Sequence, residues 1–122
     1  MRYLDKEQLT TNLKLGKSIE QWLGSQNEQD YNILKWIRID KEKTTEYSLL
    51  YFEVFDDGDD KTFDVYEFEP VDPDAQFGII NTFDSIDDLL EFAKNNYMVS
   101  ENKFVNSGVL QEEYKNYREE MM

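Results

Sequence analysis

The 122-residue sequence contains no cysteine and no histidine. Without cysteine, neither disulfides nor thiolate metal sites can form. Without histidine, the chain lacks the commonest general base, the commonest metal ligand and the side chain that titrates near neutral pH. It also carries no glycine-rich phosphate loop and no nucleophile elbow. We therefore predict a protein that is not an enzyme and that needs no cofactor.

Long apolar runs are also missing. No stretch is long enough to cross a bilayer, so we expect no membrane association. The first 17 residues include no apolar core of a signal peptide, and together with the lack of cysteine this favours a cytoplasmic protein. The length predicts a single globular domain over residues 1–122, with a frayed tail at about 119–122.

Negative charge is abundant and unevenly distributed. The net charge is −14, and Glu53 to Glu91 holds 14 acids against one base, Lys61, whereas Met1 to Phe52 is balanced. Such a surface repels phosphates, so direct binding of nucleic acid is not expected. It would attract a basic protein or cations. The simpler interpretation is an acidic surface that keeps the protein soluble.

An N-terminal helix is predicted from Leu4 to Gly24. Asp5 is suited to the N-cap, and Gln8 follows in the spacing of a capping box. Apolar residues recur at helical spacing up to Leu23, and Gly24 is placed to end the helix. Gly16 lies inside this pattern and weakens it.

Strands are predicted at Ile33 to Asp40, Leu49 to Phe55 and Thr62 to Glu69, with a short strand or extended segment at Phe77 to Phe83. The segment from Tyr47 to Asp74 is expected to form the centre of the sheet. Pairing apolar residues across its hairpin gives a register with Phe55 opposite Thr62. The expected pairs are Val54–Phe63, Phe52–Val65, Tyr51–Tyr66, Leu49–Phe68 and the like-charged pair Glu53–Asp64.

Two helices are predicted after the strands. Asp84 or Ser85 caps the first of them, whose buried stripe contains Ile86, Leu89, Leu90, Ala93 and Tyr97 and whose opposite face is acidic. A loop from Met98 to Asn106 tucks Phe104 and Val105 inward, and a final helix covers Gly108 to Glu120. The order favours an α+β fold: an antiparallel meander of three to four strands, with an N-terminal helix and two C-terminal helices packed on it.

The acidic hairpin is the candidate site. Its tip, Asp56-Asp57-Gly58-Asp59-Asp60, fails the EF-hand pattern because Phe55 would occupy a ligand position. Aromatic residues such as Tyr47, Tyr51 and Tyr66 are expected to lie exposed among carboxylates, where tyrosines serve as interface anchors. The predicted partner-binding residues are Glu53, Asp56, Asp57, Asp59, Asp60, Asp64 and Glu67, with Tyr51 and Tyr66 as anchors.

The leading hypothesis is a small binding protein that docks on a basic protein and neutralises or regulates it. In size and charge the chain is similar to immunity proteins, antitoxins and nucleic-acid mimics, although no family motif carries that similarity. Two alternatives stay open. One is an accessory domain that self-associates through a sheet edge or its first helix. The other is a weak Ca²⁺ or Mg²⁺ binder at Asp57, Asp59 and their neighbours.

Overall fold

A computed structural model describes residues 3–56, 68, 71 and 79–121 of the chain. The elements follow in the order α1 (Lys6–Lys14), β1 (Ile19–Asn27), β2 (Asn32–Lys43), β3 (Glu46–Phe55), β4 (Ile79–Phe83), α2 (Ile86–Tyr97), β5 (Val105–Asn106) and α3 (Leu110–Met121). The fold is therefore α+β, as the sequence predicted. The antiparallel sheet has five strands, one more than the upper expectation.

The strands are arranged in the order β4-β3-β2-β1-β5, and each described neighbour is antiparallel. The centre of this sheet is β2, whereas the sequence placed the centre at the hairpin that begins with β3. Leu49 faces Ile39 of β2 on one side and Asn81 of β4 on the other. Tyr51 lies between Ile37 and Ile79 in the same way. The expected pairs Leu49–Phe68 and Tyr51–Tyr66 are therefore wrong.

The segment Thr62 to Glu69 lies outside the described residues apart from Phe68, and so do the expected pairs Val54–Phe63, Phe52–Val65 and Glu53–Asp64. Phe68 itself packs edge-on against Tyr114 of α3, with ring centroids 5.4 Å apart. It thus contributes to the core beside α3.

The largest correction concerns the first helix, which ends at Lys14 rather than Gly24. Its N-terminus is as expected, because Asp5 and Gln8 form the reciprocal capping box. Gly16 adopts a positive φ of 83°, and the N–H groups of Gly16 and Lys17 donate to the carbonyls of Leu13 and Asn12. This is the Schellman arrangement, in which a left-handed glycine terminates a helix.

Ile19 to Asn27 then pairs with β2 as a strand, and its apolar residues suit a sheet as well as a helix. Gly24, the expected helix terminator, has a φ of 111° and lies where the β1–β2 register shifts by one residue after Trp22. A glycine at such a bulge allows a backbone conformation that other residues rarely adopt.

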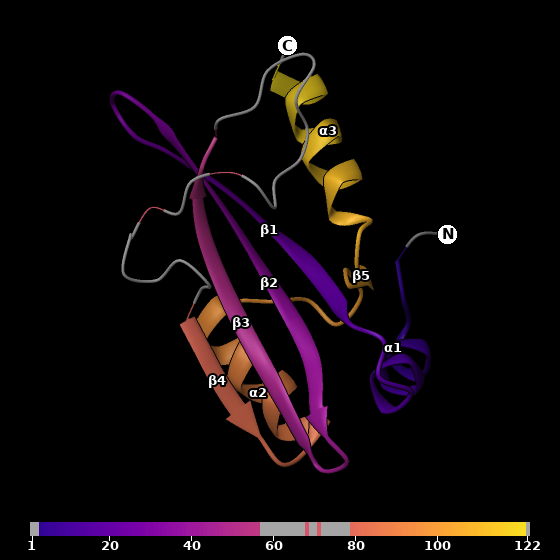
Figure 1. Cartoon of the computed structure of the whole chain (residues 1–122). Coiled ribbons are helices and arrows are strands. Elements are labelled where there is room, and N and C mark those ends of the chain that lie inside the picture. Colours follow the sequence, from indigo (N-terminus) through magenta and orange to yellow (C-terminus); the bar gives the residue numbers. More distant parts are fainter. Residues whose placement is uncertain (1–2, 57–67, 69–70, 72–78, 122) are drawn as a thin grey trace.

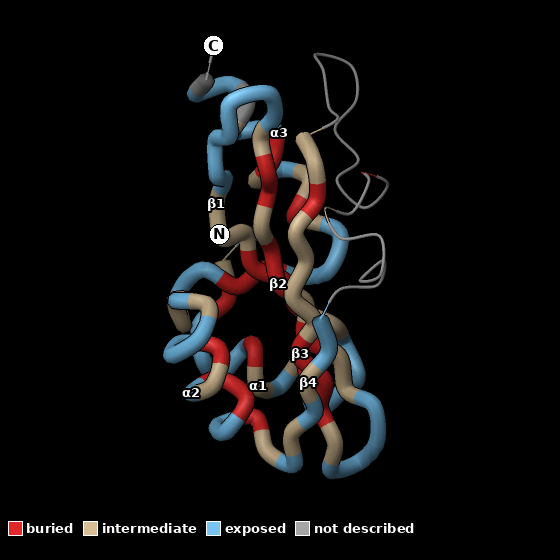
Figure 2. Tube along the Cα trace, turned by 90° about the vertical axis from the view of Figure 1, so that its left-hand side faces the viewer, coloured by how far each residue is buried: buried red, intermediate tan, exposed pale blue. Residues whose placement is uncertain are grey.

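The two faces of the sheet carry separate cores (Figure 1). On one face, α1 and α2 cover Ile19, Ile37, Ile39 and Leu49. On the other, Leu110 and Tyr114 of α3 pack on Leu34, Trp36 and Val54. Figure 2 shows these buried segments enclosed between the helices and the strands, with exposed chain at the periphery. Side chains alternate across a strand, so β2 supplies residues to both cores.

Candidate binding surface

Only three of the predicted partner-binding residues lie in the described part of the chain. Tyr51 and Glu53 belong to β3, and Asp56 follows directly after it. The other six fall outside the described residues: Asp57, Asp59, Asp60, Asp64, Tyr66 and Glu67. Tyr47, which the sequence placed among the exposed aromatics, is only 6% exposed and belongs to the core beneath α1 and α2.

Tyr51 is half-buried and stacks on Tyr97 at the end of α2. The two residues line a hollow of about 370 Å³ together with Gln21, Trp22, Leu23, Lys35, Asn96 and Met98. Burial raises the pKa of Tyr51 well above its ordinary value, and the Glu53 carboxylate raises that pKa further by its charge and by accepting a hydrogen bond. Burial and Glu53 also raise the pKa of Tyr97. Both phenols therefore stay neutral and able to donate hydrogen bonds at neutral pH.

Glu53 is compensated inside the chain. It lies opposite Lys35 in the β2–β3 ladder, with 4.0 Å between the Lys35 ammonium and the carboxylate. Its backbone carbonyl accepts a hydrogen bond of 3.0 Å from the Val71 N–H. Lys35 is thus the cross-strand counterion of Glu53.

Asp56 acts on the opposite face of the sheet. Its carboxylate accepts a hydrogen bond from the hydroxyl of Tyr114, a fully buried residue of α3. Its backbone N–H donates to the Asn32 carbonyl at 2.9 Å. Glu53 and Asp56 therefore each have a structural contact of their own, Glu53 with Lys35 of β2 and Asp56 with Tyr114 of α3.

The second acidic surface lies at the start of α2, with Asp84 just before the N-cap and the other three acids in the first two turns. Ser85 is the N-cap, and its hydroxyl accepts from the Asp88 N–H at 3.1 Å. Four carboxylates on the side away from the sheet are exposed: Asp84, Asp87, Asp88 and Glu91. Only Asp87 pairs with a described cation, Lys6, at 3.7 Å, and both side chains of that pair are largely exposed. We refer to these four residues as the α2 acidic face.

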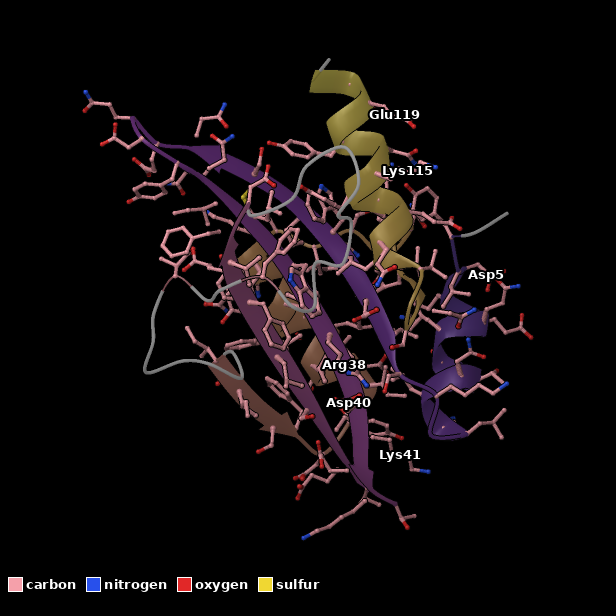
Figure 3. The ribbon with its side chains drawn as sticks, turned by 45° about the horizontal axis from the view of Figure 1, so that its top comes forward. Asp5, Arg38, Asp40, Lys41, Lys115 and Glu119 are labelled. Atoms are coloured by element: carbon pink, nitrogen blue, oxygen red, sulfur yellow. The ribbon has the colours of Figure 1, made fainter. Side chains whose placement is uncertain are left out.

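A polar network joins β1, β2 and the turn before α3. Arg38 donates to both carboxylate oxygens of Asp40, at 3.0 and 3.2 Å (Figure 3). It also lies 3.9 Å from the carboxylate of Glu20, which is completely buried and accepts from the Gly108 N–H at 3.0 Å. Arg38 therefore neutralises two carboxylates and joins β1 to β2.

Sequence reasoning missed Tyr97 and Met98 as part of the hollow beside Tyr51. Tyr97 was assigned to a buried stripe, and nothing local indicates that its ring stacks on a distant strand. The Lys35–Glu53 pair could not be read from the turn between β2 and β3. A turn at Thr44-Thr45 alone would put Lys35 opposite Val54, and the register shift between Lys41 and Lys43 moves Lys35 opposite Glu53.

Within the described residues, no three acidic side chains come together as a metal site would require. The alternative hypothesis of Ca²⁺ or Mg²⁺ binding concerns the Asp57–Asp60 segment, which lies outside the described residues. None of the described helices combines the length and apolar character needed to traverse a bilayer. No protein-family model, curated protein or solved structure matches this chain.

Proposed function

We propose that this protein is a small, non-enzymatic binding protein of the cytoplasm that docks on a basic protein and neutralises or regulates it. The observation that carries the proposal is the confinement of charge, since the segment from Glu53 to Glu91 holds 14 acids and one base. A field of one sign accelerates the encounter with an oppositely charged partner and repels nucleic acid.

The α2 acidic face supports the proposal from the geometry. All four of its carboxylates are exposed, and three of them have no ion-pair partner among the described residues. Ser85 caps α2, and the buried residues Leu89, Leu90 and Ala93 hold it against the sheet. A rigid helix therefore presents these charges without the ordering cost that a flexible acidic tail would incur.

Glu53 and Asp56 contribute differently to the proposed surface. Glu53 already has Lys35 as counterion, and Asp56 already accepts from Tyr114. Docking on them would require these contacts to change. We therefore assign the first encounter with the partner to the α2 acidic face. The residues Asp57, Asp59, Asp60, Asp64 and Glu67 remain part of the proposed surface on the strength of their charge alone.

The test compares two triple charge reversals of equal net charge. The first variant changes Asp84, Asp88 and Glu91 to lysine, and the control changes three exposed acids elsewhere, Glu7, Asp30 and Glu119. Immobilised wild-type protein captures its partner from an extract of the source cell. Stopped-flow association is then measured with that partner after purification, at low and at high salt.

We expect a basic partner whose association slows by about tenfold or more with the first variant, and far less with the control. Added salt should slow association with the wild type and should have little effect on the first variant. If both variants slowed association equally, net charge alone would explain the effect, and the assigned role of the α2 acidic face would be wrong. Recovery of no basic protein by the wild type would overturn the proposal as a whole.

A further inference from the structure

The outer edge of β1 is only partly covered in the described part of the chain. β5 pairs with it at Ile19 and Glu20 and at no later residue. Just before β5, the carbonyl of Phe104 accepts from the Leu4 N–H at 2.8 Å. Lys103 belongs to the loop between α2 and β5, which the Gln21 side chain holds at Ser100. From Gln21 onward, no described strand lies beside this edge.

The hydrogen bonds of β1 show which backbone groups point outward. The Ser107 N–H donates to the Ser18 carbonyl at 3.2 Å on the β5 side. In an antiparallel ladder every second residue directs its N–H and C=O to the same edge, so those of Glu20 and Trp22 face outward too. On this side of β1, Glu20 pairs with Val105 of β5, whereas Trp22 pairs with no described strand. An edge of this kind offers a template for another chain.

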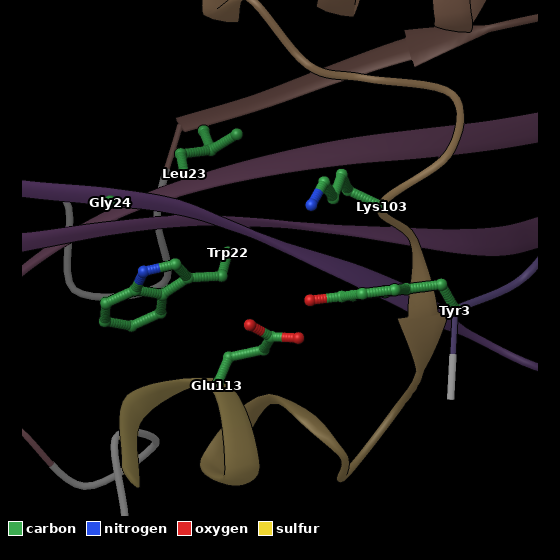
Figure 4. Close-up of a pocket in the computed structure, with 6 residues that line it drawn as sticks. All are labelled: Tyr3, Trp22, Leu23, Gly24, Lys103 and Glu113. Carbon is green, nitrogen blue, oxygen red and sulfur yellow. The ribbon is translucent and has the colours of Figure 1, made fainter. Parts of the chain in front are cut away.

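A hollow of about 260 Å³ adjoins this edge on the α3 side, lined by Tyr3, Trp22, Leu23, Gly24, Lys103 and Glu113. In Figure 4 the polar ends of Tyr3, Lys103 and Glu113 converge on one space. The ammonium of Lys103 lies 5.1 Å from the centroid of the Tyr3 ring. A Cβ added at Gly24 would meet nothing within 4 Å, so the face of the strand is uncrowded there.

The hollow beside Tyr51 and Tyr97 adjoins the same edge from the other face of the sheet. Trp22 and Leu23 line both hollows, so the backbone of β1 divides them. Met98, which is 89% exposed, forms part of the rim of this second hollow. Successive side chains of a strand point to opposite faces. A chain paired with Trp22 would therefore direct neighbouring side chains into the two hollows in turn.

We propose that the β1 edge from Trp22 to Gly24 binds an extended segment of a protein partner, which adds to the sheet as an antiparallel strand beside β1. Main-chain hydrogen bonds to Trp22 provide the attachment, and the hollows select alternate side chains. The side chain opposite Trp22 is basic, because the net charge of −14 attracts it and because the Glu113 carboxylate and the Trp22 ring line the hollow that it enters. Lys103, whose ammonium lies over the Tyr3 ring in the same hollow, moves aside when this side chain binds. The next side chain is apolar and packs against Tyr97 and Met98. This goes beyond the proposed function, since no contact with the α2 acidic face is required.

A single extended segment fits this edge better than a second copy of the protein. Trp22, Leu23 and Gly24 are all half-buried, with Tyr3 and Lys103 on one flank and Glu113 of α3 on another. A second copy would bring the same flanking groups to its own β1, including the Glu113 carboxylate, which would face its equivalent. The overall charge of −14 opposes such pairing and favours a basic segment.

The test uses a capped hexapeptide of alternating arginine and valine, with a fluorescent label for anisotropy. Two methylated versions serve as matched probes, one with methyl groups on the arginine backbone nitrogens and one with them on the valine nitrogens. In the proposed register the arginine opposite Trp22 directs its N–H at β1, whereas the valine N–H groups point away. Methylation of the arginine nitrogens should weaken binding by about tenfold or more, and methylation of the valine nitrogens should have little effect.

Protein variants locate the site of binding. Glu113→Gln should weaken binding of the unmodified peptide by about threefold, whereas Glu112→Gln, at an exposed position one residue earlier, should not. Amide NMR shifts on titration should centre on Trp22 to Ser25. The triple reversal of the α2 acidic face should leave these shifts in place, which separates this proposal from the proposed function.

Three outcomes would overturn the inference. Equal binding of the two methylated peptides would mean attraction by charge without strand addition. No saturable binding up to about 1 mM would mean that the edge takes no such segment. Sedimentation that shows a stable dimer, with the Trp22 amide protected from exchange before any peptide is added, would assign the edge to a second copy.

Discussion

The rings of Tyr51 and Tyr97 lie almost parallel, with centroids 4.3 Å apart and planes inclined by 7°. This contact joins the middle of β3 to the last residue of α2, and Phe92 extends it edge-on at 6.1 Å from Tyr97. The contact also gives one hollow its aromatic wall. An aromatic pair contributes about 0.5–1.5 kcal/mol beyond its buried area. Tyr97→Ala is therefore expected to lower the free energy of unfolding by about 2 kcal/mol, measured by urea denaturation.

Alkaline pH should destabilise the protein through the same two tyrosines. Their pKa values are raised on folding by burial and by Glu53, so the folded state holds these protons more tightly than the unfolded chain. The stability gained is fully present below the ordinary tyrosine pKa of 10.0 and is lost as the pH rises toward the folded values. Denaturation at about pH 8 and about pH 11 measures this loss.

The double variant Tyr51→Phe/Tyr97→Phe should lose less stability over that interval than the wild type. Tyr31→Phe is the control, because Tyr31 is exposed and lies outside the stack. An equal alkaline loss in the wild type and the double variant would show that the stacked phenols are not its source.

Gly16→Ala should destabilise the protein by about 1 kcal/mol or slightly more, because a side chain disfavours the left-handed backbone. Gly16 has a φ of 83°, and a Cβ there would meet nothing within 4 Å, so the cost comes from the backbone alone. Gly16→Asn should cost less, since asparagine tolerates this conformation. Thermal and urea unfolding measure both variants, and Thr11→Ala at an exposed helical position provides the baseline. A Gly16→Ala variant as stable as the wild type would argue against the helix end at Lys14.

Tyr114 and Tyr117 should respond in opposite ways to loss of the hydroxyl. The Tyr114 hydroxyl donates to the Asp56 carboxylate, and Tyr114→Phe should cost about 1–3 kcal/mol because the bond is to a charged group. The buried Tyr117 hydroxyl has no hydrogen-bond partner among the described residues, so Tyr117→Phe should be neutral or stabilising. Urea denaturation of the two variants side by side gives the comparison. The reverse order of stabilities would contradict the assigned hydrogen bond.

The start of α2 can be tested by two neighbouring alanine substitutions. The Ser85 hydroxyl accepts from the Asp88 N–H, so Ser85→Ala should cost about 0.5–2 kcal/mol. Asp84 precedes the cap and is exposed, so Asp84→Ala should change the free energy of unfolding by a few tenths of a kcal/mol at most. A larger loss for Asp84→Ala would move the helix start by one residue.

Helices that are specified by their own residues could be predicted from the sequence. The capping box at Asp5 specifies where α1 begins, and α2 follows from a cap, first-turn acids and a regular apolar stripe. The acidic face of α2 could be placed for the same reason, because helical periodicity determines which side chains share a side. The register of β2 on β3 was not predictable in this way, because it shifts by one residue between Lys41 and Lys43.

Ile19 to Asn27 could not be assigned locally, because its apolar spacing suits a helix and a strand alike and only pairing with β2 decides between them. The candidate site depends on the same kind of information. By itself the sequence determined the α+β class, the locally signalled helices and strands, and the confinement of negative charge. Only the tertiary structure decided that Glu53 meets Lys35, that Tyr51 stacks on Tyr97 and that an open edge of β1 lies between two hollows. These contacts join residues far apart in the chain, and their partners are selected by packing, which no local pattern encodes.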